Sequence, residues 1–254
     1  MSKEVCIALV GNRGRMGNAL QTRWLAAGFC VEGVDQPLEN AQLDQLCSKA
    51  QVVLLCVPIP AFVSVLQRLR PHLHSAQILA DIASVKLQAM QHMQAVAKGP
   101  VVGTHPLFGP DMTGALQVAL CPGSNADAGH CAFMERLFAA IGCTSFISSA
   151  EEHDRAVASI QGLNFVTSAA YFAALAEHEE LLPFLTPSFK RRMEAARSML
   201  TSDGQLFESL FEANPASQEA VRNYRAFLNL AAGGDLSLLR ERAAWWWKEK
   251  PCKP

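Results

Sequence analysis

A histidine and a serine follow two apolar, strand-like runs, where side chains could act on a bound ligand. His105 lies in Gly103-Thr-His-Pro-Leu-Phe-Gly-Pro110, and Ser84 lies in Asp81-Ile-Ala-Ser-Val-Lys86. The carboxyl ends of parallel strands form the edge of a sheet at which ligands bind. Histidine titrates near neutral pH, so His105 could accept the proton of a substrate hydroxyl. Ser84 could hold the same hydroxyl or orient the imidazole.

Each of these residues also has a structural interpretation. A loop histidine before a proline can be purely structural, and Ser84 could cap the helix that the sequence predicts from Lys86. Lys86 itself could simply be exposed to solvent. The residue types alone leave these alternatives open.

A glycine-rich turn follows the first strand-like run of the chain. It reads Gly11-Asn12-Arg13-Gly14-Arg15-Met16-Gly17 and opens a predicted helix. Such a turn sets backbone N–H groups and the positive end of a helix against a pyrophosphate. Gly14 and Gly17 have the spacing of the last two glycines of GxGxxG, whereas Asn12 stands where the first is expected. We therefore expect the whole turn to bind a dinucleotide, although glycine turns of this kind also occur by chance.

Asp35 follows the second predicted strand and favours NAD as the cofactor. A carboxylate about 20 residues after the glycine turn can accept both ribose hydroxyls, and it would repel the 2′-phosphate of NADP. The alternative is a turn residue before Pro37. Val57 and Pro58 begin the loop after the third strand, and such loops line the nicotinamide side of this fold.

The first half of the chain alternates between strand and helix patterns. Strands are predicted at 5–10, 29–35, 52–57, 77–81, 100–104 and 144–148, with helices at 16–27, 61–70, 86–98 and 128–141. This alternation indicates a parallel sheet with helices on both faces. After residue 149 only helical patterns follow. We expect an α/β fold with a Rossmann-like parallel sheet in residues 1–149 and an all-helical second domain in residues 150–254.

The composition limits the classes of partner. Half of the 254 residues are hydrophobic and the net charge is -1, which predicts no binding of nucleic acid or acidic membrane. The eight cysteines form no CxxC pair and have no zinc-finger spacing, so we expect reduced thiols, no metal site and a cytoplasmic location. No apolar run is long enough for a membrane span. A helical domain must bury its apolar faces, and pairing of two copies predicts a homodimer.

The two edge motifs together resemble the prephenate dehydrogenase family, whose members carry Asp-x-x-Ser-Val-Lys and Gly-x-His-Pro-x-x-Gly. Glu152-His-Asp154 and Ala158-Ser-Ile-Gln-Gly-Leu163 are similar to the start of that family's helical domain. The likeness is in particular to the dehydrogenase part of fused chorismate mutase–prephenate dehydrogenases, and it runs from the first strand to about residue 163.

This resemblance implies NAD-dependent oxidative decarboxylation of prephenate, or a close analogue, to 4-hydroxyphenylpyruvate in tyrosine biosynthesis. The ring carbon that bears the hydroxyl gives a hydride to NAD while a base accepts the hydroxyl proton. Loss of the ring carboxylate then yields an aromatic ring. On matching positions, His105 is the base and Ser84 contacts the same hydroxyl.

The chain departs from the family where the substrate is held. By an ungapped pairing, Phe165 takes the place of a histidine, and the place of an arginine falls near Ser198. A substrate with two carboxylates needs cations, and arginine binds carboxylate in a bidentate manner. The candidates are Lys86, Arg191, Arg192 and Arg197. An amino-substituted prephenate is an alternative substrate.

Other functions are weighed against this one. A non-catalytic NAD-binding protein would explain the departures, but it would need no base at His105. Gly-x-x-Gly-Arg-Met-Gly also resembles dihydrodipicolinate reductases, whose histidine- and lysine-rich catalytic segment is missing. A β-hydroxyacid dehydrogenase would need a lysine base in the helical domain, and Lys190 lies in no such motif.

Overall fold

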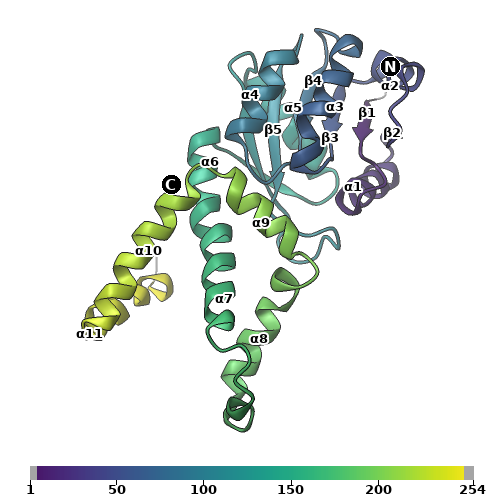
Figure 1. Ribbon diagram of the computed structural model, residues 1–254. Coiled ribbons are helices and arrows are strands. Elements are labelled where there is room, and N and C mark those ends of the chain that lie inside the picture. The colour runs from purple at the N-terminus through teal and green to yellow at the C-terminus, as the bar shows by residue number, and fades with distance from the viewer. Residues whose placement is uncertain (1–4, 249–254) are drawn as a thin grey trace. The chain divides into compact units, whose positions relative to one another are not determined.

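The computed structural model describes residues 5–248 (Figure 1). Contacts divide the chain into two compact units, Met1–Val157 and Ala158–Pro254. The division falls eight residues after the boundary expected from the sequence, so helix α6 (Ala150–Val157) belongs to the first unit.

The first unit is built on a seven-stranded sheet with the order β2-β1-β3-β4-β5-β6-β7. Neighbouring strands are parallel except β5 and β6, which are antiparallel. A mostly parallel sheet followed by helices confirms the expected fold class. The strands are β1 (Cys6–Val10), β2 (Cys30–Val34), β3 (Val52–Leu55), β4 (Ile78–Asp81), β5 (Val101–Pro106), β6 (Gln117–Pro122) and β7 (Thr144–Ile147).

Strand β6 is missing from the sequence prediction. Its core, Val118 to Cys121, is buried and apolar, but it follows a stretch rich in glycine and proline that marks a loop. Residues 107–116 join β5 to β6 without a crossover helix, and such a short connection requires antiparallel strands.

Helices cover the sheet of the first unit (Figure 1). Side chains alternate along the strands, so Ala8 and Val10 of β1 pack into one apolar cluster while Ile7 and Leu9 pack into another. Helix α2 also escaped prediction, because it buries only a narrow stripe of three side chains among polar ones. The helices are α1 (Arg15–Ala26), α2 (Asn40–Lys49), α3 (Ile59–Leu69), α4 (Leu87–Val96), α5 (Ala128–Ala139) and α6.

The described part of the second unit, residues 158–248, contains helices and no strand. Apolar side chains remain exposed on it, among them Phe184 and Trp247, at 77% and 83%. No helix within residues 5–248 combines the length and the apolar character that crossing a membrane requires. A π-helical turn (Ala158–Gly162) precedes α7 (Leu163–Ala173), α8 (Pro187–Leu200), α9 (Gly204–Ala213), α10 (Ser217–Ala232) and α11 (Leu236–Ala243).

Candidate active site

The glycine turn joins the end of β1 to the start of α1. Gly11 has a φ of +91°, and a Cβ there would lie 2.4 Å from the carbonyl oxygen of Cys56. A Cβ on Gly17 would lie 2.3 Å from the carbonyl oxygen of Gly11. Both positions therefore require glycine. No side chain caps the N-terminus of α1, and Gly14 stands at its N-cap, so the first turn can present N–H groups to an anion.

Asn12 fits the turn in place of the usual first glycine because the neighbouring strand makes room for it. A Cβ on Gly33 of β2 would overlap the Asn12 side chain, at 2.4 Å from its nitrogen. The same amide donates a hydrogen bond to Gln21 on α1, at 3.0 Å. The missing glycine of the motif is thus compensated by a glycine on β2.

Asp35 lies just beyond β2, beside the glycine turn. Its carboxylate accepts hydrogen bonds from the backbone N–H of Arg13, at 3.0 Å, and of Gln36, at 2.7 Å. Asn12, Arg13 and Asp35 line one pocket of about 360 Å³, together with Glu32 on β2. Half a dinucleotide could enter this pocket, with its ribose hydroxyls donating to Asp35.

The other residues of the predicted cofactor site lie around the turn and the end of β3. Met16 and Val57 are half-buried and pack against the two apolar clusters, whereas Arg15 is exposed. Pro58 is exposed at the N-cap of α3.

His105 lies in β5 rather than in a loop, and it is only 4% exposed. Its Nδ1 is 2.9 Å from Nε2 of His153 on α6. The Nδ1 of His153 is 2.8 Å from Oδ1 of Asp154. Three side chains of the first unit therefore form one hydrogen-bonded chain.

The carboxylate of Asp154 determines which atom donates and which accepts in both hydrogen bonds of this series. A carboxylate only accepts, so His153 donates its Nδ1–H to Asp154 and carries a lone pair on Nε2. His105 then donates its Nδ1–H to that lone pair. This leaves Nε2 of His105 without a proton, as a general base requires.

Asp154 also fixes the start of α4. Its two oxygens accept the backbone N–H groups of Lys86, at 2.7 Å, and of Leu87, at 2.9 Å. These donors belong to the first turn of the helix, whose dipole favours a negative charge. The proton-accepting chain is thereby joined to the segment that carries Ser84.

Lys86 is completely buried and forms an ion pair inside the protein. Its Nζ is 2.5 Å from Asp81 and 2.7 Å from the carbonyl oxygen of Thr104. Burial raises the pKa of the Asp81 carboxyl, and the ammonium of Lys86 opposes that shift. This geometry corrects the assignment of Lys86 to substrate binding, because its charge is used within the protein.

The surroundings of His105 keep its imidazole neutral. Burial, His153 and the Lys86 ammonium lower the pKa of His105 well below its usual value. Each of these effects disfavours the protonated ring. At neutral pH the side chain is therefore a base.

Ser84 is half-buried in the connection from β4 to α4. It does not cap that helix, because the N-cap residue is Lys86. Within residues 5–248, no hydrogen bond joins the Ser84 hydroxyl to His105.

Residues 27–146 match the family model described as prephenate dehydrogenase, nucleotide-binding domain. Residues 27–146 therefore form a nucleotide-binding domain of the prephenate dehydrogenase family. Strands β2 to β7 lie within the matched range, apart from the last residue of β7.

Curated proteins are also similar to this chain over most of its length. The chain is 31% identical over 225 residues to a T-protein of Enterobacter agglomerans, covering 86% of this chain and 59% of that protein. It spans about half the length of the curated relatives it matches.

Solved structures of dehydrogenases share the fold. Arogenate dehydrogenase from Synechocystis is 22% identical, with a TM-score of 0.76 over 95% of this chain and 97% of the other. Prephenate dehydrogenase from A. aeolicus, in complex with hydroxyphenyl propionate and NAD+, is 18% identical, with a TM-score of 0.77 over 96% and 94% of the two chains.

The sequence places His153 and Asp154 in a segment similar to the prephenate dehydrogenase family but indicates no role for either side chain. An adjacent histidine and carboxylate at the start of a helix carry no signal for a hydrogen bond to a strand 48 residues earlier. Only the fold brings α6 against β5.

The three arginine candidates for substrate binding lie on α8, in the second unit. The guanidinium of Arg192 stacks over the ring of Tyr171, 3.7 Å from its centroid, and Arg197 is 3.7 Å from Glu194. Arg191 is exposed beside them. Phe165 stacks on Phe207, with ring centroids 5.8 Å apart, so this ring packs where relatives have a histidine by the ungapped pairing.

Proposed function

We propose that this protein is an NAD-dependent dehydrogenase that oxidises prephenate, or a close analogue, with loss of its ring carboxylate. The product from prephenate would be 4-hydroxyphenylpyruvate, formed in the cytoplasm as a step of tyrosine biosynthesis. The single observation that supports this function best is the chain from Asp154 through His153 to His105, which leaves Nε2 as a base at the end of β5. An NAD-binding protein without catalysis would not need it.

The side chains of the first unit would handle one proton. Bound NAD supplies the hydride acceptor, and the glycine turn with Asp35 would hold it. As the hydride leaves the ring carbon, Nε2 of His105 accepts the hydroxyl proton. The positive charge on the imidazole is stabilised through His153 by Asp154. When the carboxylate leaves as CO2, its bonding electrons enter the ring, and the proton returns to the phenolic oxygen.

Turnover with NAD tests this function. Prephenate and its amino-substituted analogue arogenate should be compared at equal concentration, by the absorbance of NADH and by the release of CO2. We expect NADH and CO2 to form together from one of the two substrates. Tight NAD binding without turnover of either would favour the non-catalytic alternative, which the packing of Phe165 on Phe207 motivates.

Replacing Asp35 with serine should shift cofactor preference from NAD towards NADP. The wild-type carboxylate would bind the ribose hydroxyls and repel a 2′-phosphate, and serine removes that charge. The ratio of kcat/KM for the two cofactors measures the effect. Equal efficiency of the wild type with both cofactors would contradict the assigned role. Glu39→Ser, at an exposed carboxylate before α2, is the matched control and should leave the ratio unchanged.

We further propose a homodimer that forms through the helical unit. Many large apolar side chains are exposed there, and pairing of two copies would bury them. Sedimentation at micromolar concentration should give twice the mass of the chain, and a monomer would refute the proposal. The exposed set includes Leu182, Phe184, Leu206, Leu228, Trp246 and Trp247.

A further inference from the structure

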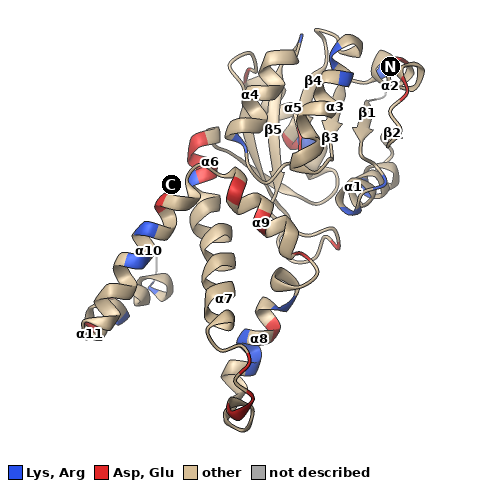
Figure 2. Ribbon diagram, viewed as in Figure 1, with Lys and Arg blue, Asp and Glu red and all other residues tan. Residues whose placement is uncertain are grey.

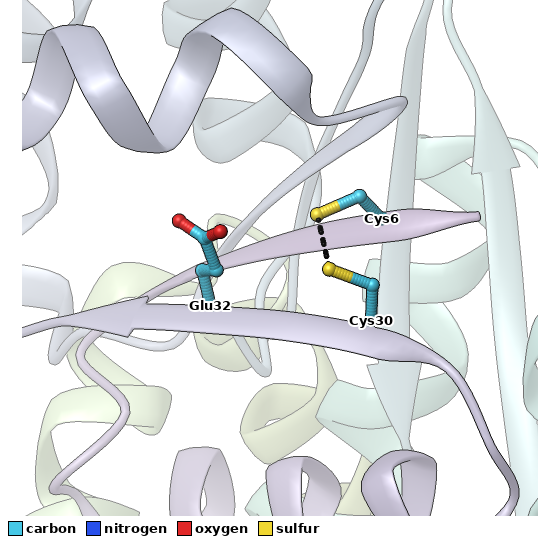
Figure 3. Close-up of side chains that lie close together, drawn as sticks. All are labelled: Cys6, Cys30 and Glu32. Carbon is cyan, nitrogen blue, oxygen red and sulfur yellow. Dashed lines mark hydrogen bonds between the residues drawn. The ribbon is translucent and has the colours of Figure 1, made fainter. Parts of the chain in front are cut away.

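Two cysteine thiols face each other across the first residues of β1 and β2 (Figure 3). Cys6 and Cys30 are register partners, and their Sγ atoms are 3.0 Å apart. They lie at the amino ends of β1 and β2, whereas His105 lies near the carboxyl end of β5, at the opposite edge of the sheet. The proposed reaction makes no use of them.

A carboxylate joins the pair from the same face of the sheet. Glu32 follows Cys30 by two residues on β2, and side chains two apart in a strand share a face. One ligand atom from each of the three residues lies within 4.8 Å of the other two. The register partner of Glu32 is Ala8, whose methyl group leaves space beside the carboxylate.

Burial and backbone contacts hold the group while leaving it accessible. Cys6 is 6% exposed, whereas Cys30 and Glu32 are half-buried. The backbone N–H of Cys6 donates to the side chain of Gln51, at 2.6 Å, and that of Cys30 donates to the carbonyl oxygen of Val5, at 3.2 Å. A small cation could enter from the side of Cys30 and keep a water molecule.

We propose that Cys6, Cys30 and Glu32 bind a thiophilic divalent cation, with Zn²⁺ as the best fit. Zinc takes thiolate and carboxylate ligands in a tetrahedron, and water would fill the fourth position. Zn–S bonds of about 2.3 Å place two sulfurs roughly 3.8 Å apart, so the thiols need to separate by less than about 1 Å. On binding, each thiol releases its proton to solvent and its sulfur forms a bond to the metal.

The carboxylate of Glu32 beside the two thiols favours a cation over a disulfide between them. Neighbouring strands lie about 4.7–4.9 Å apart, and side chains of register partners in a parallel pair stand side by side. A disulfide would bring the two sulfurs from 3.0 Å to about 2.05 Å and would leave the neighbouring carboxylate of Glu32 without a role. A metal ion would use all three side chains. Because the ligands come from two strands, no motif in the sequence indicates the site.

Binding is tested on the reduced full chain, with Co²⁺ as a spectroscopic probe and Zn²⁺ as its competitor. One equivalent of Co²⁺ should produce thiolate-to-metal charge-transfer absorption, and one equivalent of Zn²⁺ should abolish it. Cys6→Ser and Cys30→Ser should weaken binding by more than the roughly 10–100-fold that loss of an outer-shell partner causes. Glu32→Gln should weaken it less. Cys131→Ser, at a thiol on α5 that is 4% exposed, is the matched control and should bind normally.

Stability gives a second readout that does not depend on activity. Zn²⁺ should raise the melting temperature of the wild type and of Cys131→Ser, but not that of Cys30→Ser. Cys30 is half-buried, so its serine variant should fold even where Cys6→Ser does not. Unchanged affinity in the Cys30 variant would overturn the site, and unchanged affinity in Glu32→Gln would overturn the third ligand. A Cys6–Cys30 disulfide formed by oxidised glutathione, in a protein that binds no cation when reduced, would also overturn the proposal.

Discussion

Replacing His105 with asparagine should lower kcat by about two to four powers of ten, the usual contribution of a general base. Asparagine can still donate a hydrogen bond to Nε2 of His153, but it cannot accept the proton of a hydroxyl group. The KM for the substrate should change much less, because the interaction lost is made in the transition state. Stopped-flow and steady-state rates with NAD and the active substrate measure the effect.

The pH profile of the same reaction separates a base from a structural histidine. The base must be neutral, and the environment lowers the pKa of His105 below the usual value. The acid limb of kcat/KM should therefore lie below about pH 6.5, the value of free histidine. His105→Asn should lose that limb and keep the melting temperature of the wild type. A stable variant that turns over within a few-fold of the wild type would remove His105 from the mechanism.

Replacing Asp154 with asparagine should have an effect of comparable size, although Asp154 need not touch the substrate. An amide that donates to His153 reverses both hydrogen bonds of the chain, because Nε2 of His153 must then carry the proton. His105 would accept on Nδ1 and hold its proton on Nε2, where the base is needed. The corresponding change in a Ser-His-Asp triad lowers kcat by about 10⁴.

The tautomer itself can be observed without turnover. Nitrogen NMR of labelled histidine should place the proton of His105 on Nδ1 in the wild type and on Nε2 in Asp154→Asn. Glu152→Gln, at an exposed carboxylate on the same helix, should change neither the tautomer nor kcat. Loss of activity in Asp154→Asn with an unchanged tautomer would mean that Asp154 acts only through the backbone of α4.

The sequence predicted those parts of the fold that have strong local patterns. The strands before Gly11 and Ser84 are continuous apolar runs that end at turn residues, so their positions followed from composition alone. Helix α2 and strand β6 were missed because the first is mostly polar and the second follows a segment that looks like a loop. Tertiary packing decides both.

The candidate site also has parts that the sequence predicted and parts that it did not. The glycine turn and Asp35 are short local signals in the sequence, and Asn12 and Arg13 of the turn line one pocket with Asp35. The sequence could not predict the role of Lys86, because nothing in it distinguishes a buried lysine from an exposed one. The role follows from the contacts of its Nζ with Asp81 and Thr104. The contact between His105 and His153 joins residues 48 positions apart, and no spacing rule anticipates it.

Figure 2 shows Lys, Arg, Asp and Glu on both units. By their positions in the chain, Asp81, Lys86 and Asp154 belong to the first unit. Because α6 belongs to that unit, Asp81, Lys86, His105, His153 and Asp154 form a module that ends before Val157. A cut at residue 149 would divide this module, whereas a cut after residue 157 would not. The helices from α7 onward can therefore change in sequence without altering a side chain of the His105–His153–Asp154 series.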